Sequence, residues 1–304
     1  MAELFVPRTL DEAIGFLASH AGSATPIAGG TDVMIDMRTG RVRTQWLVDL
    51  SPLVSLAGVD LDGEQLRLGA LTKIRALEVD PQLARRATAL VEAARVLGSV
   101  QIRTMATIGG NLCHATPSAE LPPALLVHDA VVEIAGSAGE RSMPLADLFA
   151  GPGRTTLEPE ELLTAVRLHV PSSAAGSCYL RQTVRWSMDL AGVGVAASME
   201  VDGATVVQAR VALGAVAPVP LVVPEAAEAV VGSELSPETA LEAGARAAAA
   251  CSPISDVRGS ADYRRAVVSI LVQRALQIAW LRATEDWPDG VLAPINGLLA
   301  EEAA

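Results

Sequence analysis

Two paired glycines constrain the fold of this chain more than any other feature of its sequence. The first pair lies within Pro26-Ile27-Ala28-Gly29-Gly30-Thr31-Asp32, and the second lies within Thr107-Ile108-Gly109-Gly110-Asn111. Each pair stands between a short apolar run and a polar residue of a helix-capping type. Glycine permits positive φ angles and lacks the Cβ that would hold a ligand away from the backbone, so several N–H groups can converge on an anion. Two such loops predict one ligand with two phosphates.

The composition limits the class of protein. A chain of 304 residues is long enough for two or three domains with a sizeable core. Its formal net charge of −12 argues against a nucleic acid or an anionic membrane as partner. No apolar run reaches the roughly 20 residues of a membrane-spanning helix, and the N-terminus lacks the basic start and apolar core of a signal peptide. We therefore expect a cytoplasmic protein without a membrane span.

The cysteines and histidines form no metal-binding pattern. Cys113, Cys178 and Cys251 lie far apart in the chain, unlike the close pairs of a zinc site or the four thiolates of an iron–sulfur cluster. Each is predicted to be a small buried apolar residue. The histidines, which also lack ligand spacing and are predicted to be structural or surface residues, are His20, His114, His128 and His169. Any iron–sulfur cluster that serves this chain must belong to a partner.

Capping signals and hydrophobic patterns divide the chain into three parts, 1–57, 58–172 and 173–304. In the first part, Thr9-Leu10-Asp11-Glu12 is a capping box, and Thr31 or Asp32 is a candidate cap for a second helix. In the second part, Asp62-Gly63 predicts the turn of a hairpin. The predicted elements of these two parts are helices over 10–20, 31–38, 72–78 and 82–97 and strands over 46–50, 58–61, 65–68, 130–135 and 162–169.

The third part is predicted to be an antiparallel sheet backed by helices. Strand-like runs cover 179–184, 190–201 and 205–216, and Asp202-Gly203 predicts a second hairpin turn. The windows 224–231, 237–250 and 260–283 are rich in Ala, Leu and Arg, which favours helices. We therefore expect an α+β protein, with two N-terminal α/β subdomains followed by an antiparallel sheet with a helical bundle.

Common catalytic motifs are missing from the sequence. It contains no G-x-S-x-G elbow, no H-E-x-x-H, no G-x-x-x-x-G-K-[ST] and no G-x-G-x-x-G at the start of a βαβ unit. These motifs are typical of hydrolases, zinc proteases, P-loop proteins and dinucleotide-binding domains. We therefore expect neither a catalytic residue nor a metal ligand in this chain.

The second glycine pair belongs to a longer pattern that is specific to one family. The run from Gln101 to Pro123, QIRTMATIGGNLCHATPSAELPP, resembles the FAD-binding medium subunits of molybdenum hydroxylases, of the carbon monoxide, xanthine and nicotine dehydrogenase types. These subunits pair an A-G-G-T-D-like segment with I-R-N-x-A-T-I-G-G-N-L, and here both occur in that order. The segments Pro7 to Ala13 and Pro159 to Leu163 fit as well, so the resemblance covers nearly the whole chain.

The resemblance implies the FAD-binding fold of the vanillyl-alcohol-oxidase type, in which FAD lies between the two N-terminal subdomains. Backbone N–H groups of the first segment would hold the pyrophosphate, aided by the positive end of the following helix. The second segment would line the opposite side of the cofactor. The cofactor-binding residues implied for the two segments are Ile27, Ala28, Gly29, Gly30, Thr31, Asp32, Thr107, Ile108, Gly109, Gly110 and Asn111.

The resemblance also implies cofactor contacts outside the glycine segments. Glu120 stands where relatives usually have Asp, and it would accept hydrogen bonds from ribose or ribityl hydroxyls. Its alternative role is that of an acid at a helix N-terminus. Leu97 and Leu163 would pack against the cofactor, or they are ordinary core leucines.

Two charged residues of the third part complete the implied site. Arg181 replaces a frequent Lys and would stabilise negative charge at the pyrimidine edge of the flavin, with a reach and geometry that differ from those of Lys. Asp189 aligns with a recurring acid of the family, and we favour for it a salt bridge to Arg181 or Arg185.

By this resemblance, the chain is the electron-transfer subunit of a heterotrimeric molybdenum hydroxylase, assembled as a dimer of heterotrimers. A large molybdopterin subunit would oxidise the substrate, and a small subunit with two [2Fe–2S] clusters would relay electrons to the FAD of this chain. The final acceptor, which is NAD⁺, oxygen, a quinone or a carrier protein, stays open. So do two alternatives: a self-sufficient FAD-dependent oxidase or dehydrogenase, and a non-catalytic assembly subunit.

Overall fold

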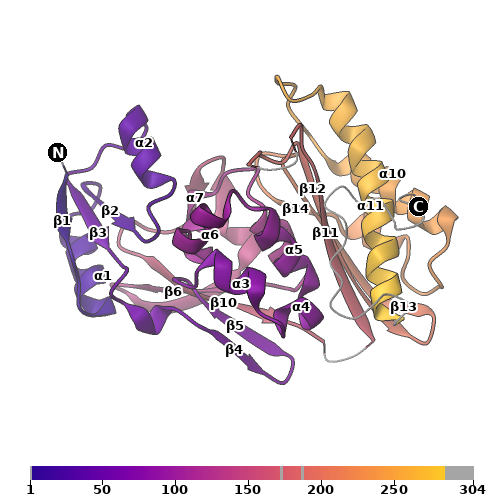
Figure 1. Cartoon of the computed structure of the whole chain (residues 1–304), viewed down its shortest axis with the longest axis horizontal. Helices are drawn as coiled ribbons and strands as arrows, with labels where there is room; N and C mark the ends of the chain where they lie inside the picture. The colour runs from indigo at the N-terminus through magenta and orange to yellow at the C-terminus, as the bar shows by residue number, and fades with distance from the viewer. Residues whose placement is uncertain (1, 172–173, 186–187, 285–304) are drawn as a thin grey trace.

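The chain begins with a small parallel sheet (Figure 1). Strand β3 (Trp46–Asp49) lies between β1 (Glu3–Phe5) and β2 (Ala24–Ile27) and is parallel to both. Helix α1 (Leu10–Ser19) is confirmed, and the Thr9 side chain accepts a hydrogen bond from its first turn. Helix α2 (Val33–Thr39) buries no residue and projects from the sheet. The structure describes residues 2–171, 174–185 and 188–284.

A five-stranded antiparallel sheet forms the middle of the molecule. Its strand order is β4-β5-β10-β6-β7, and the predicted hairpin at Asp62-Gly63 joins the first two strands. The helices of this part gather on one face of the sheet (Figure 1). The elements are β4 (Val59–Asp62), β5 (Gln65–Gly69), α3 (Ile74–Val79), α4 (Leu83–Arg86), α5 (Thr88–Val96), α6 (Val100–Met105), α7 (Ile108–His114), α8 (Leu121–Leu126), β6 (Val131–Gly136), β7 (Gly139–Pro144), β8 (Phe149–Gly151), β9 (Arg154–Thr155) and β10 (Leu162–His169), with a short 3₁₀ turn at Leu145–Leu148. Another 3₁₀ turn, Val54–Leu56, ends the first part.

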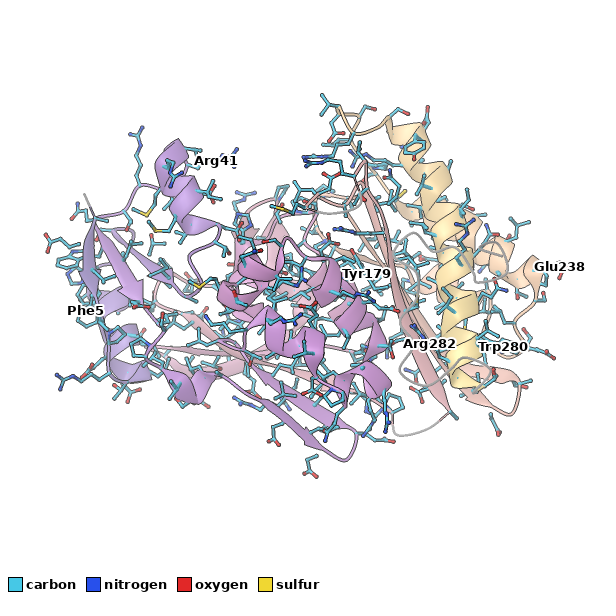
Figure 2. The ribbon with its side chains drawn as sticks, viewed as in Figure 1. Phe5, Arg41, Tyr179, Glu238, Trp280 and Arg282 are labelled. Carbon is cyan, nitrogen blue, oxygen red and sulfur yellow. The ribbon has the colours of Figure 1, made fainter. Side chains whose placement is uncertain are left out.

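The last part is a four-stranded antiparallel sheet with the order β11-β12-β13-β14. Helix α11 packs on β11 and β12, and α10 packs on α11. Figure 2 shows Tyr179 at the boundary with the middle part and Trp280 on α11. The elements are β11 (Ala175–Gln182), β12 (Val193–Asp202), β13 (Thr205–Gly214), β14 (Leu221–Val222), α9 (Pro224–Glu228), α10 (Pro237–Ala250) and α11 (Ala261–Ala283).

Helix α11 alone, among the described helices, is long and apolar enough by length and composition to cross a membrane. It buries Val268, Val272 and Leu276 in the same core as strands β11 to β13. Core packing therefore accounts for its apolar character.

Two differences from the predicted elements have clear causes. The helix predicted over 82–97 is interrupted at Ala87, whose φ of −136° and ψ of 52° separate α4 from α5. Just before the break, Arg86 donates hydrogen bonds to the carbonyl oxygens of Gly63, Val170 and Pro171, which holds this turn against two distant segments. Elements such as β1 and β14 were not predicted because they are too short to show a hydrophobic period.

The second glycine pair lies in a helix, not in a loop. Gly109 and Gly110 form the first turn of α7, and its N-cap is Thr107. The Thr107 hydroxyl accepts a hydrogen bond from the N–H of Gly110 at 3.1 Å, as a helix-capping side chain does. Of the four paired glycines, Gly30 alone has a positive φ, of 70°.

Each of the three larger sheets has its own cluster of buried apolar side chains. The cluster at the first sheet also includes Leu71, Ala135 and Leu162 from the middle part. The first two parts therefore share buried surface. The boundaries at residues 57 and 172 stay predictions.

Candidate cofactor site

The first glycine segment presents backbone donors that the protein does not use. It connects β2 to α2, and the N–H groups of Gly29, Gly30, Thr31 and Asp32 meet no acceptor within the described residues. Asp32, one of the two predicted candidates, is the N-cap residue of α2, but its side chain makes no capping hydrogen bond. Unused N–H groups at the carboxyl end of a parallel strand suit an anionic ligand.

Gly29 is required by protein packing. A Cβ built on Gly29 would lie 2.2 Å from the carbonyl oxygen of Met105, which is too close for any side chain. The space beside Gly29 is therefore filled by the backbone at the end of α6, so packing by itself accounts for a glycine at this position. The contact fixes the first glycine segment against the middle part of the chain.

The second glycine segment is held by hydrogen bonds to the protein itself. The four N–H groups from Ile108 to Asn111 donate to the carbonyl oxygens of Thr72, Ala70 and Thr107 and to the Thr107 hydroxyl. A Cβ on Gly109 would lie 2.9 Å from the Cβ of Ala70, so Gly109 also serves packing. The expectation that both glycine pairs offer N–H groups to phosphates is therefore wrong for the second pair. Whether this segment lines a cofactor stays a prediction.

The two segments meet at a junction between α2 and α7. His114 Nε2 lies 3.4 Å from a carboxylate oxygen of Asp36, and Nδ1 lies 4.0 Å from one of Asp32. On α7, the side-chain oxygen of Asn111 is buried and has no hydrogen-bond partner in the described structure. Such atoms are uncommon in native proteins. An unpaired buried acceptor fits a hydroxyl or N–H donor of a bound molecule.

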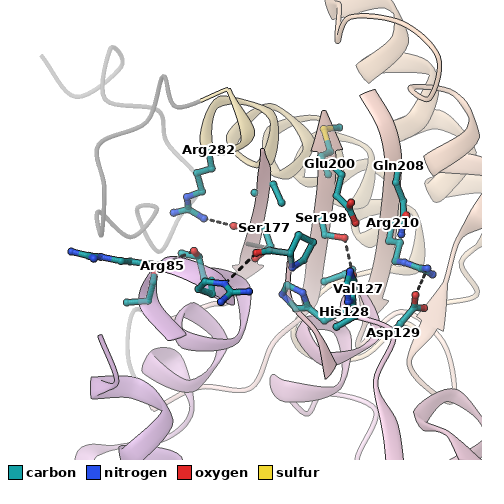
Figure 3. A pocket seen from close by; sticks show the side chains of 18 residues that line it. Arg85, Val127, His128, Asp129, Ser177, Ser198, Glu200, Gln208, Arg210 and Arg282 are labelled. Atoms are coloured by element: carbon teal, nitrogen blue, oxygen red, sulfur yellow. Dashed lines mark hydrogen bonds and ion pairs between the residues drawn. The ribbon is translucent and has the colours of Figure 1, made fainter. Parts of the chain in front are cut away.

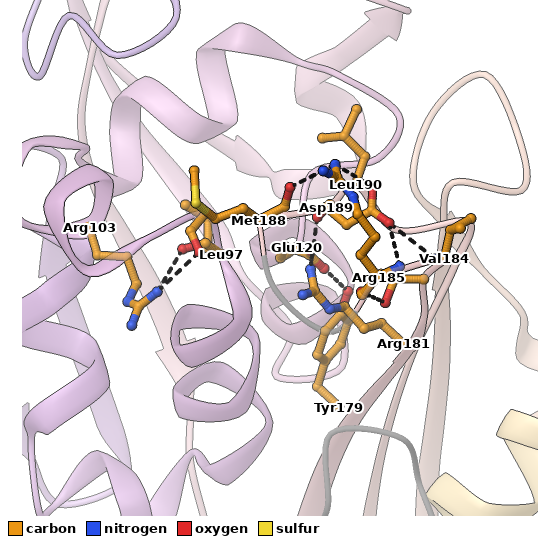
Figure 4. A network of polar contacts seen from close by, with 12 residues as sticks. Leu97, Arg103, Glu120, Tyr179, Arg181, Val184, Arg185, Met188, Asp189 and Leu190 are labelled. Atoms are coloured by element: carbon orange, nitrogen blue, oxygen red, sulfur yellow. Dashed lines mark hydrogen bonds and ion pairs between the residues drawn. The ribbon is translucent and has the colours of Figure 1, made fainter. Parts of the chain in front are cut away.

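Glu120 and Arg181 form a buried ion pair (Figure 4). One carboxylate oxygen of Glu120 accepts a hydrogen bond from Arg181 Nη1, and the other accepts one from the Tyr179 hydroxyl. Burial raises the pKa of Glu120, although the Arg181 charge and the Tyr179 hydrogen bond oppose this. Burial and the Glu120 charge raise the pKa of Tyr179 well above its usual value, so this hydroxyl stays protonated and donates.

Tyr179 was not among the predicted site residues. It lies in β11, two positions before Arg181. Because side chains at i and i+2 of a strand share a face, Tyr179 points to the same side as Arg181. That alternation is the signal from which the sequence could have added Tyr179 to the site.

Asp189 organises the turn between β11 and β12. Its carboxylate accepts hydrogen bonds from the backbone N–H groups of Val184, Arg185 and Leu190 at 2.9 to 3.1 Å. Burial raises the pKa of Asp189, but these hydrogen bonds and the Arg185 charge outweigh it and lower the pKa. The favoured salt bridge is confirmed for Arg185, at 3.5 Å, whereas Arg181 donates to the Asp189 backbone carbonyl.

Leu97 and Leu163 lie in different surroundings. Leu163 is buried in the core of the middle part, so packing alone accounts for it. Leu97 follows the last turn of α5 and is partly buried, and its carbonyl accepts a hydrogen bond from Arg103 Nη1 at 3.0 Å. Arg103 is itself buried and paired with Glu78, so it fixes this end of α5. Contact of either leucine with a cofactor stays a prediction.

A separate polar cavity of about 80 Å³ lies between the middle part and β11 to β13 (Figure 3). Its arginines contact protein groups: Arg210 pairs with Asp129, and Arg282 donates to Ser177 O. Burial lowers the pKa of His128, which also lines the cavity, to about 4. The cavity shares no lining residue with the glycine segments or with the Glu120 network.

The thiols follow the sequence prediction in part. Cys178 and Cys251 are buried as predicted, but Cys113 is exposed on α7, so that prediction is wrong. Helix α7 packs Ile108 and Leu112 into the core, and Cys113 lies on another face of the helix. The described residues contain no group of three His, Cys, Asp or Glu side chains that could hold a metal ion.

Comparison with known proteins identifies the family. The family model described as "FAD binding domain in molybdopterin dehydrogenase" matches residues 1–172. A second model, "CO dehydrogenase flavoprotein C-terminal domain", matches residues 178–279. The chain belongs to the FAD-binding medium subunits of the molybdopterin dehydrogenases. The cofactor residues predicted for this medium subunit fall within the first model, apart from Arg181.

Relatives match the medium subunit over nearly their whole length. The carbon monoxide dehydrogenase medium chain of Afipia carboxidovorans is 32% identical over 91% of this chain and 96% of its own. The xanthine dehydrogenase FAD-binding subunit of Escherichia coli O157:H7 is 31% identical over 89% and 93%. The structure of a carbon monoxide dehydrogenase from Hydrogenophaga pseudoflava matches 92% of this chain and 98% of that chain, at 31% identity and a TM-score of 0.89. The predicted family and its mixed α+β fold are confirmed.

Proposed function

We propose that this medium subunit is the FAD-carrying electron-transfer subunit of a heterotrimeric molybdenum hydroxylase. The observation that carries the proposal is the match of the FAD-binding domain model to residues 1–172. The unused N–H groups from Gly29 to Asp32 support it, because they form a site for an anionic group where the family resemblance expects the FAD pyrophosphate. In this proposal FAD lies between two subdomains of the vanillyl-alcohol-oxidase type.

The residues of the candidate site fit a bound FAD. The four N–H groups of the first glycine segment would hold the diphosphate, and the Asn111 side-chain oxygen would accept a hydrogen bond from the cofactor. Arg181 Nε is buried without a partner in the described structure and would donate to the flavin. Glu120 retains lone pairs for a ribityl hydroxyl beyond those that Arg181 and Tyr179 use. FAD supplies electron exchange that single side chains cannot provide.

We further propose the partners and the compartment. Electrons would arrive from [2Fe–2S] clusters on a small subunit, after a large molybdopterin subunit has oxidised the substrate, and would leave to an external acceptor. The name "medium chain" of the carbon monoxide dehydrogenase relatives supports a multi-subunit complex. We propose a dimer of heterotrimers in the cytoplasm.

The proposal is tested by reconstituting the purified chain with FAD and recording the flavin spectrum after removal of free cofactor. We expect the wild type to retain FAD and Gly110→Leu to lose it, because Gly110 lies one helical turn before His114, on the side of α7 that meets the first glycine segment. An added Cβ would also lie 3.0 Å from the Thr107 hydroxyl. Gly15→Leu is the matched control, since Gly15 is also exposed and helical and has no atom within 4 Å of its added Cβ. A wild type without retained flavin refutes the proposal.

The same purified proteins distinguish the proposed subunit from a self-sufficient oxidase, and they test the position of the second glycine segment. If the FAD-loaded chain alone rapidly oxidises small organic substrates, the self-sufficient oxidase replaces the partner-dependent subunit. If Gly110→Leu retains FAD as well as Gly15→Leu does, the second glycine segment is not at the cofactor.

A further inference from the structure

Lys73 is the single lysine of the chain, and apart from histidine its other basic residues are arginines. It precedes α3 and pairs with Thr107, the N-cap of α7, in an isolated β-bridge. Its ammonium donates a hydrogen bond to the carbonyl oxygen of Met105 at 2.9 Å. Met105 O is the same atom that lies against Gly29. One carbonyl group therefore connects Lys73 to the first glycine segment.

Three carboxylates lie at or near the first glycine segment. Asp32 is its last residue, Asp36 follows on α2 and pairs with the exposed Arg41 at 3.4 Å, and Asp49, which lies opposite Ile27 across β2 and β3, is at its start. A diphosphate placed against the unused N–H groups would be repelled by these carboxylates. The Lys73 ammonium offsets that repulsion, and two of its three N–H donors are not used by Met105.

We propose that Lys73 supplies the positive charge that binds the diphosphate of FAD at the first glycine segment, an inference that rests on the proposed function. The N–H groups from Gly29 to Asp32 fix the position of the anion, and the ammonium adds a charge-assisted hydrogen bond. Neither group alone gives the site both geometry and charge.

The partial burial of the Lys73 ammonium agrees with this role. Burial lowers the pKa of Lys73, and the negative charge of Asp49 opposes the shift. A partly desolvated ammonium gains more from an added anion than a fully hydrated one does. FAD therefore makes Lys73 less reactive toward acylating reagents, both by covering it and by stabilising its protonated form.

The test uses the fact that only one lysine is present. The full-length wild type is treated with an N-hydroxysuccinimide ester of acetate, and acetylation of Lys73 is followed by mass spectrometry with the N-terminal amine as internal reference. We expect FAD to slow acetylation of Lys73 about tenfold, because the charge-assisted contact occupies the amine. Riboflavin, which lacks phosphates, serves as the control ligand and should leave the rate unchanged.

Binding measurements with variants give the second readout. We expect Lys73→Met to weaken FAD binding about 10- to 100-fold, the range for a hydrogen bond to a charged group. Lys73→Arg should retain most of the affinity, since it retains the charge. Arg75→Met is the matched control on α3, because Arg75 is half exposed and paired with Glu78, and it should stay within about twofold of the wild type.

The outcomes separate the two proposals. If the wild type binds FAD, but FAD does not protect Lys73 or Lys73→Met binds FAD as tightly as the wild type, this inference is overturned and the proposed function stands. If the wild type does not bind FAD, both fall. The acetylation experiment uses the unaltered chain, so it decides the question even if Lys73→Met does not fold.

Discussion

The buried pair of Glu120 and Arg181 makes a stability prediction whose size follows from the structure. Their side chains are 6% and 2% exposed, so neither charge has water as an alternative partner. Replacing Arg181 by Met retains the volume of the side chain and leaves the Glu120 carboxylate buried without its counter-charge. Removing one partner of a buried pair costs about 3 to 5 kcal/mol.

Protonation of Glu120 limits this cost. If the carboxyl is neutral in the folded protein at pH 7 but ionises with its ordinary pKa of 4.5 in the unfolded chain, the folded state is destabilised by about 1.4 kcal/mol for each pH unit above that pKa. At pH 7 this cost is about 3 kcal/mol in all. Burial already raises the pKa of Glu120, and without Arg181 it rises further. A raised folded-state pKa contributes stability below the unfolded pKa, and this contribution is lost as the pH rises through the folded pKa. The deficit of Arg181→Met is therefore largest at pH 7 and shrinks toward pH 5.

Urea unfolding of the wild type, Arg181→Met and the double variant Glu120→Gln/Arg181→Met at pH 5 and pH 7 measures this effect. We expect Arg181→Met to be about 3 kcal/mol less stable at pH 7 and the double variant to recover most of the loss. The control is Arg265→Met, which breaks an exposed pair with Asp262 at 2.9 Å and should cost less than about 0.5 kcal/mol. A deficit below about 1 kcal/mol at pH 7, or one that is equal at both pH values, would refute the reasoning.

Two further predictions concern other positions. Burial lowers the pKa of His128 to about 4, so as the pH falls this side chain is protonated in the unfolded chain before it is protonated in the folded protein. The free energy of unfolding therefore falls from pH 6.5 toward pH 4, by about 2 kcal/mol at pH 5. Unfolding titrations should show this slope flattened in His128→Gln, and an unchanged slope would assign it to other groups. Gly29→Ala should cost about 1 to 3 kcal/mol, since its Cβ would meet the Met105 carbonyl, whereas Gly15→Ala should be neutral or stabilising. Thermal unfolding of both variants checks this, and equal melting temperatures would contradict the packing role of Gly29.

The fold was predictable where local contacts decide it. The Thr9 cap, the hairpin turns at Asp62-Gly63 and Asp202-Gly203, and helix α10 all follow from neighbouring residues in the chain. The break at Ala87 was not predictable, because Arg86 binds carbonyl groups of segments that are distant in the sequence. Local propensity has no information about such contacts.

The candidate site was predictable as a list of residues but not as an arrangement. Glu120 and Arg181 were both named, yet their ion pair and its link to Tyr179 depend on how β11 packs beside α8. A role for Lys73 was not predictable from the sequence, because the Met105 carbonyl that it contacts, and Gly29 beside that carbonyl, come from other segments.

The sequence by itself determined the family, the order of the elements and the two glycine segments, because motifs and caps depend on the chemistry of adjacent residues. Only the tertiary structure decided what each glycine pair does. The N–H groups from Ile108 to Asn111 are used by Thr107 and by the segment at Ala70 and Thr72, whereas those from Gly29 to Asp32 have no acceptor in the described structure. The two glycine segments therefore differ in their capacity to bind an anion, because a backbone N–H can donate to a ligand only where the fold does not place a protein acceptor opposite it.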